Sequence, residues 1–173
     1  MSQIVRRNTI RYCGISGLSG MGTTNTLVED NLIEWCGWAD AERGWEAAGA
    51  KFHRAQNMLF RRNVVRHMRH ANAVWWDVGN NNCLITSNVF ADILTVGAAV
   101  HIEMTSGQNQ IDNKIVWDVR NAEPGTPGQR GCAGHREGRQ PGLHFSAFAA
   151  RATCPRAARS SAGRKALGSC TAR

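Results

Sequence analysis

Short apolar stretches recur along the first two thirds of the chain, and an asparagine lies in each of them. The five stretches contain Asn8, Asn31, Asn63, Asn88 and Asn113, at intervals of 23, 32, 25 and 25 residues. Repeats of this length are typical of a solenoid, in which each unit buries its apolar face only by stacking on its neighbours. Asparagine suits a repeated corner because it tolerates a left-handed backbone and its side-chain amide can bond to the next coil.

Within one coil the pattern divides into three short strands. Residues 73–78, 83–87 and 89–93 read as strands, with turns at 79–82, at Asn88 and before Gly97, and residues 99–104 open the next coil. We therefore predict an all-β protein, a right-handed parallel β-helix of about five coils over residues 3–119. The five asparagines should stack at one corner.

Alternation along the first strand of each coil separates an inner from an outer face. Three apolar sets should line the interior: Ala50 and Phe52; Val74, Trp76 and Val78; and Val100, Ile102 and Met104. The residues between them form an outward stripe on three adjacent coils: Lys51 and His53, Trp75 and Asp77, and His101 and Glu103. One insertion or deletion in the turns is needed to align them.

One coil is longer than the others because residues 37–49 are inserted just before the Lys51–His53 strand. The insertion carries aromatic and charged residues, namely Trp38, Asp40, Glu42, Arg43, Trp45 and Glu46. It could wall a groove beside the stripe or be only a surface loop, and the sequence leaves both readings open.

The chain changes character after residue 119. Residues 1–119 hold 11 basic and 11 acidic residues, whereas residues 120–173 hold 10 basic and 2 acidic residues and so carry the whole net charge of +8. After Asn121 there is no Ile, Val, Asn, Asp, Met, Trp or Tyr, and all four prolines lie there. We expect residues 120–173 to be a disordered basic tail or an out-of-frame product starting near residues 131–135.

Composition excludes several partners and cofactors. The positive charge belongs to one unusual tail and not to a folded face, so nucleic-acid binding is not predicted. None of the six cysteines forms a Cys-x-x-Cys pair, and no metal or cofactor is predicted. Cys13 and Cys36 should stack on adjacent coils, as buried thiols in preference to a disulfide. No secretory signal or membrane-length apolar run is present, and the chain begins in mid-pattern, so location and oligomeric state stay undecided.

The outward stripe has the residue types of a carbohydrate site. Aligned on adjacent coils, Asp77 and Glu103 would place carboxyls about 5 Å apart, the spacing of retaining glycosidases. Two close carboxyls repel, so one of them can hold a proton and act as an acid. Trp75 offers a flat face for a sugar ring, and Lys51, His53 and His101 offer hydrogen bonds to hydroxyls. The alternative without a functional site is that outward residues are polar only because they face water.

Residues 73–77, 85–90, 100–103 and 111–115 resemble the catalytic coils of right-handed parallel β-helix glycoside hydrolases, and those of glycoside hydrolase family 120, the β-xylosidases, most of all. The resemblance implies that Asp77 is the nucleophile and Glu103 the acid/base of a retaining glycosidase, with a carbohydrate as partner. The N-terminal coils and the accessory β-sandwich domain of that family are missing, which suggests a fragment. A polysaccharide lyase using Lys51, His53 or His101 as base, and a non-catalytic glycan-binding β-helix, are the alternatives.

Overall fold

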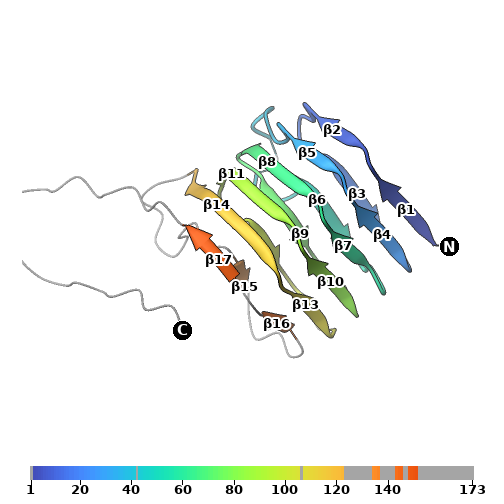
Figure 1. The fold of residues 1–173 in the computed structure, drawn as a ribbon. Coiled ribbons are helices and arrows are strands. Elements are labelled where there is room, and N and C mark those ends of the chain that lie inside the picture. The colour runs from blue at the N-terminus through green and yellow to red at the C-terminus, as the bar shows by residue number, and fades with distance from the viewer. Residues whose placement is uncertain are drawn as a thin grey trace, which may run out of the picture.

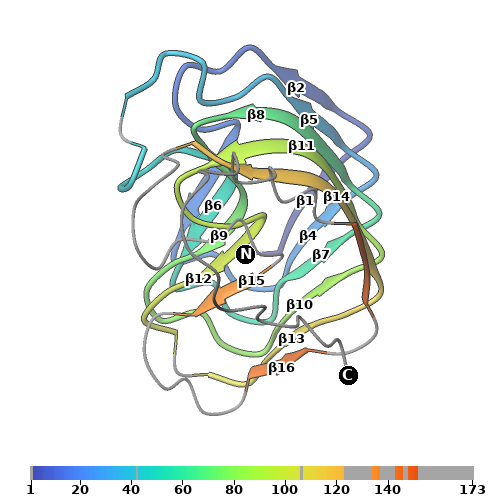
Figure 2. The same ribbon diagram turned by 90° about the vertical axis from the view of Figure 1, so that its left-hand side faces the viewer.

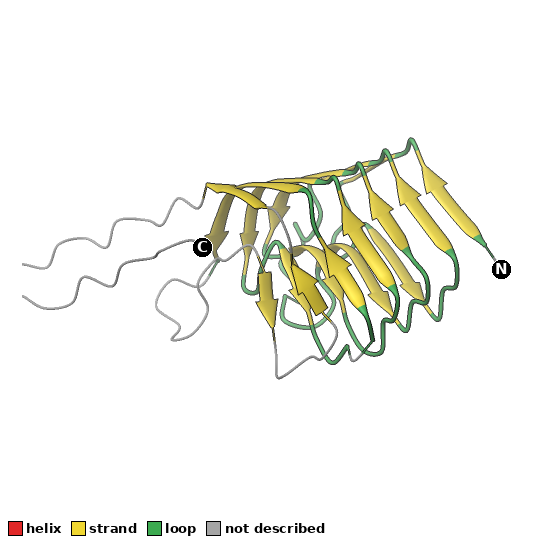
Figure 3. Ribbon diagram, turned by 60° about the horizontal axis from the view of Figure 1, so that its bottom comes forward, coloured by secondary structure: helices red, strands yellow, loops and turns green. Residues whose placement is uncertain are grey.

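The computed structural model describes residues 2–41, 43–105 and 107–122, and the backbone of three further strands at residues 134–136, 143–145 and 148–151. Parallel strands wind repeatedly through three sheets and stack along one axis (Figure 1). The described residues contain strands and connecting turns and no helix (Figure 3). The predicted all-β parallel β-helix is confirmed.

Each complete coil contributes one strand to each of the three sheets. The first consists of β1 (Gln3–Arg6), β4 (Thr26–Glu29), β7 (Leu59–Arg61), β10 (Cys83–Thr86), β13 (Asn109–Ile111) and β16 (Leu143–Phe145). The second consists of β2 (Thr9–Arg11), β5 (Leu32–Glu34), β8 (Val64–Arg69), β11 (Val89–Thr95), β14 (Lys114–Asn121) and β17 (Phe148–Arg151). The third consists of β3 (Leu18–Met21), β6 (Ala48–His53), β9 (Asn72–Trp76), β12 (Val100–Ile102) and β15 (Gly134–Arg136). Viewed along the axis, successive coils overlie one another (Figure 2).

Four complete turns run from β1 to β12, and β13 and β14 begin another. Regular pairing extends slightly beyond the predicted end at residue 119, because β14 continues to Asn121. Strands β15, β16 and β17 of the tail extend the three sheets in parallel register. The other residues from 123 onward lie outside the described residues, so the nature of the tail stays a prediction.

The core lies inside the coils, where alternate side chains of each strand meet. Phe52, Trp76 and Ile102 come from three adjacent coils of the third sheet and are 0–2% exposed. Phe60 and Ile85 form the corresponding pair in the first sheet. Two members of the predicted interior sets differ: Met104 is 62% exposed, since the backbone turns left-handed there, with φ 42°, and Val78, beyond the end of β9, is only half-buried.

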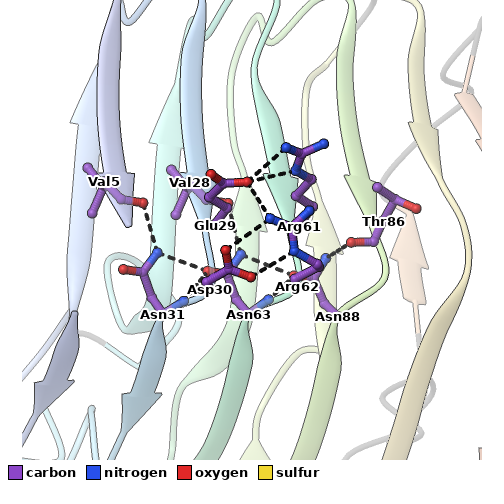
Figure 4. A network of polar contacts seen from close by, with 10 residues as sticks. All are labelled: Val5, Val28, Glu29, Asp30, Asn31, Arg61, Arg62, Asn63, Thr86 and Asn88. Carbon is purple, nitrogen blue, oxygen red and sulfur yellow. Dashed lines mark hydrogen bonds and ion pairs between the residues drawn. The ribbon is translucent and has the colours of Figure 1, made fainter. Parts of the chain in front are cut away.

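A ladder of buried asparagine side chains runs along the corner between the first two sheets (Figure 4). The backbone N–H of Asn31 donates to Oδ1 of Asn63 at 3.0 Å, and that of Asn63 donates to Oδ1 of Asn88 at 2.9 Å. The amide of Asn63 also donates to the Val28 carbonyl at 3.0 Å. Asn8 begins the ladder by donating to Asn31. Each amide thus satisfies backbone groups that the tight corner removes from the sheets.

Asn113 does not belong to this ladder, contrary to the prediction. Ile115 pairs with Val89, so the register neighbour of Asn88 on the next coil is Lys114 and not Asn113. Lys114 is buried, which lowers the pKa of its ammonium group. Asn113 is instead exposed, and its amide donates to the Ser87 hydroxyl at 3.1 Å.

The left-handed residue of the corner is the one before the ladder position. Arg7, Asp30, Arg62, Ser87 and Asn113 all have φ between 42° and 57°. The predicted double role of asparagine is therefore divided between two neighbouring positions, one for the backbone turn and one for the amide bonds.

Ion pairs cover the corner from outside (Figure 4). Arg62 donates to Asp30 at 2.7 Å and to Glu29 at 2.7 Å, while Arg61 bonds to Glu29 at 2.9 Å. The hydrogen bond from the Arg62 guanidinium lowers the pKa of the Asp30 carboxyl.

Cys13 and Cys36 are free thiols on adjacent coils, as predicted. The Gly37 N–H donates to the Cys13 carbonyl at 2.9 Å, which continues the β2–β5 ladder past both cysteines. Burial raises the pKa of the Cys36 thiol to about 12, and the neighbouring Cys13 adds to the effect.

Candidate functional site

The predicted outward stripe lies on the third sheet, and the register aligns its members. Lys51 pairs with Trp75, and Trp75 pairs with His101. Two residues further along, the Asp77 N–H donates to the Phe52 carbonyl at 3.0 Å, and the Glu103 N–H donates to the Trp76 carbonyl at 2.9 Å. These bonds continue the parallel ladder, so His53, Asp77 and Glu103 form a second row of neighbours on three coils.

Asp77 lies in a cationic environment just after the end of β9. Its Oδ2 is 3.0 Å from the Lys51 ammonium and 3.5 Å from Nδ1 of His53. Its Oδ1 accepts the N–H of Val78 at 2.8 Å. The Lys51 side chain is 2% exposed and that of Asp77 10% exposed, so this is a nearly dry ion pair. In such a setting the two charges attract more strongly than they would in water.

Trp75 is at the centre of the stripe and is not exposed, contrary to the premise of the sequence analysis. Only 3% of its surface reaches solvent. The Lys51 ammonium lies 3.6 Å from the ring centroid, and the His101 ring stacks on the indole at 4.7 Å with an interplanar angle of 12°. A sugar ring therefore has no free face of Trp75 on which to stack.

The indole edge of Trp75 contacts the second carboxyl. Nε1 of Trp75 donates to Oε2 of Glu103 at 3.2 Å. Glu103 is half-buried, and it lies beside Asp77 on the next coil. Because neighbouring strands are about 4.8 Å apart, the register allows the two carboxyls a separation of about 5 Å.

The inserted segment between β5 and β6 contacts the stripe, which the sequence left open. The Lys51 ammonium donates to the Trp45 carbonyl and lies 3.5 Å from the Glu46 carboxylate. The segment therefore covers Lys51 from outside, and its loop projects from the side of the stack (Figure 2). Glu46 and Trp45 were not predicted as site residues, although an insertion directly before a stripe strand was the available signal.

The six predicted site residues are thus brought together on three adjacent coils. Glu103 and His53 are partly exposed, whereas Asp77, Lys51, Trp75 and His101 are buried. Among the residues that the structure describes, no group of three or more His, Cys, Asp or Glu side chains could hold a metal ion. The same residues include no helix that is long and apolar enough to span a membrane.

Comparison with known families agrees with this architecture. The profile of the family described as "Right handed beta helix region" matches residues 2–123. The chain belongs to this family. The match covers the four complete turns together with β13 and β14, and it establishes the right-handed winding that the sequence analysis predicted.

A solved structure with the same fold is described as the complex structure of XylC with xylose. It shares 22% sequence identity with this chain at a TM-score of 0.52, which is a likeness of fold alone. The match covers 68% of this chain and 19% of XylC, so the chain spans about a fifth of that protein's length. No curated protein matches the sequence.

Proposed function

We propose that this β-helix is part of a retaining glycoside hydrolase of the β-xylosidase type, related to glycoside hydrolase family 120, that acts on an oligosaccharide or polysaccharide. The observation that carries the proposal is the placement of Asp77 and Glu103 at neighbouring register positions on adjacent coils, with Lys51 at 3.0 Å from Asp77. A structural neighbour solved with xylose supports the choice of substrate class.

In this proposal Asp77 is the nucleophile and Glu103 is the acid/base. The Asp77 carboxylate attacks the anomeric carbon while Glu103 gives its proton to the departing glycosidic oxygen, so a glycosyl ester forms and the glycosidic bond breaks. Glu103 then takes a proton from water, whose oxygen attacks the anomeric carbon and releases the sugar and the free Asp77 carboxylate. The two half-reactions use the same carboxyl pair.

The buried members of the stripe support the two carboxyls in this scheme. Lys51 balances the charge of Asp77 and holds its side chain, and Trp75 orients Glu103 through the indole N–H. His101 packs on Trp75 and fixes the indole plane. Of the four residues predicted to bind substrate, His53 has the exposure needed to contact a sugar hydroxyl, at 21% of its side chain.

The test is hydrolysis of aryl glycosides, beginning with aryl β-xylosides, by the full chain and its variants. Asp77→Asn should abolish turnover, because an amide cannot form the glycosyl ester. Glu103→Gln should retain activity on substrates with activated leaving groups and recover with azide, since the added anion replaces the activated water. Asp92→Asn, which changes a carboxyl on β11 of the second sheet, should hydrolyse like the unmodified chain.

Two outcomes would overturn the proposal. Release of an unsaturated, ultraviolet-absorbing product would identify a polysaccharide lyase, for which the ion pair with Asp77 makes Lys51 a poor base because a base must be neutral to accept a proton. Binding of glycans without any hydrolysis would identify a non-catalytic binding module.

A further inference from the structure

The proposed site needs an apolar surface for a sugar ring, and Trp75 does not supply one. Both faces of that indole are covered, by Lys51 on one side and by His101 on the other. An exposed aromatic side chain is carried by Trp45, a residue that is 71% exposed and contacts Lys51 through its backbone. Its own carbonyl accepts the Lys51 ammonium.

The segment that carries Trp45 is attached to the two coils on either side of its own. The Ala39 N–H donates to the Gly14 carbonyl at 3.1 Å on the first coil, and the Ser16 hydroxyl donates to the Glu46 carbonyl. Asp40 bonds to His70, which follows β8 on the third coil. These contacts hold both ends of the insertion, so the position of Trp45 is set before any ligand binds.

Two direct contacts, both made by the Lys51 ammonium, connect Trp45 with Asp77. The Trp45 carbonyl meets the Lys51 ammonium, and that ammonium lies 3.0 Å from Oδ2 of Asp77. The exposed indole is therefore carried by a residue whose backbone is linked to the Asp77 carboxyl through the single ammonium group of Lys51. An indole is a suitable surface for a pyranose whose hydroxyls are all equatorial, because such a ring presents apolar C–H groups on its faces.

We propose that Trp45 is the stacking platform for the sugar ring held beside the carboxyl pair, and that it determines specificity for an all-equatorial pyranoside. This inference rests on the proposed function. It assigns to the insertion a role in binding the ring, while the stripe residues on the coils act on the glycosidic bond.

The experiment measures binding of thio-linked xylobiose, which is not hydrolysed, by titration calorimetry on the full chain. Trp45→Ala should raise the dissociation constant about tenfold, whereas Trp45→Phe, which keeps a ring, should stay within about threefold. The carbonyl that accepts Lys51 belongs to the backbone and is kept in both variants. Trp117→Ala, on β14 of the second sheet, is the control with a tryptophan that is 49% exposed and lies on another sheet, and it should bind like the unmodified chain.

Equal binding by Trp45→Ala and the unmodified chain would overturn the platform. Equal thermal unfolding midpoints of the variants would show that a loss of binding is local, and the phenylalanine variant keeps the test valid if the alanine variant is unstable. Binding that depends on Trp45 without hydrolysis of any aryl glycoside would refute the proposed enzyme and retain the platform. Absence of binding by the unmodified chain would refute both.

Discussion

At the scale of single residues, the corner asparagines and the buried thiol of Cys36 have distinct effects on stability. Asn31, Asn63 and Asn88 each use both ends of the amide, since Oδ1 accepts a backbone N–H of the preceding coil and Nδ2 donates to a backbone carbonyl of that same coil. The network lies in the protein interior, where an unpaired polar group costs more than a bond gains.

Asn63→Ala should lower the free energy of unfolding by about 2–4 kcal/mol, because the buried Asn31 N–H and the Val28 carbonyl would both lose their partner. Asn113→Gly is the control, since that side chain is exposed and lies outside the ladder and glycine keeps the left-handed backbone of this position; it should change stability by about 0.5 kcal/mol or less. Urea unfolding followed by circular dichroism measures both. Equal effects of the two substitutions would contradict the ladder.

Cys36 should make stability depend on alkaline pH. Its thiol pKa is raised from the model-compound value of 9.0 to about 12, so above pH 9 the unfolded chain releases this proton and the folded chain keeps it. The stabilisation is complete below pH 9 and is lost as pH rises toward 12. Compared with Cys36→Ala, the unmodified chain should lose more stability over this range in urea unfolding at successive pH values. Parallel pH profiles for the two proteins would refute the assignment.

At the scale of elements, the strands depend on register more than on their own length, since many have only three or four residues. Short strands have little stability alone, and pairing on both sides with packing inside the coil must supply it. Ile85 in the middle strand β10 is fully buried and pairs with Phe60 and Ile111 on its two neighbours.

Ile85→Asp should therefore unfold the β-helix, because the substitution puts a charge without a partner into a packed interior. Ile115→Asp on β14 is the matched control, since Ile115 is 53% exposed, and it should leave the far-ultraviolet β spectrum unchanged. Circular dichroism and size-exclusion chromatography distinguish the two. A folded Ile85→Asp protein would contradict the assigned core.

The elements were largely predictable from the sequence because apolar alternation and corner residues are local signals. Strands β9, β10 and β11 lie within one or two residues of the predicted bounds at each end. Asn113 was misassigned because Lys114 occupies the ladder position in this coil and an asparagine happens to precede it. Only the strand pairing shows which of the two residues lies in the ladder. The burial of Trp75 was not predicted, because a residue outside the coil can still be covered by side chains of the neighbouring coils, here Lys51 and His101, and these contacts are not visible in local sequence.

At the scale of the whole molecule, a solenoid is a stack with two ends. Strands β1, β2 and β3 are the last strands at one end of their sheets within the described chain. Val5, Ile10 and Leu18 are only partly buried there, and Ile4 is 61% exposed. Unpaired parallel edges beside apolar side chains favour association.

Ile4→Lys should reduce concentration-dependent self-association, because a charge on the edge strand disfavours pairing with another chain. Sedimentation of the unmodified chain and the variant over a range of protein concentrations measures the effect. Ile115→Lys, an equally apolar exposed position on β14, should not change association. Association that is the same in all three proteins would place the contact elsewhere.

The spacing of the ladder has a consequence for how such proteins can diversify. Neighbouring rungs are separated by 23, 32 and 25 residues, and yet they form the same hydrogen bonds. The extra length of the second interval is absorbed between β5 and β6, and the registers before and after it are undisturbed. Segments of different length can therefore be exchanged at this junction without repacking the interior, which makes it a natural place for grafting new recognition loops.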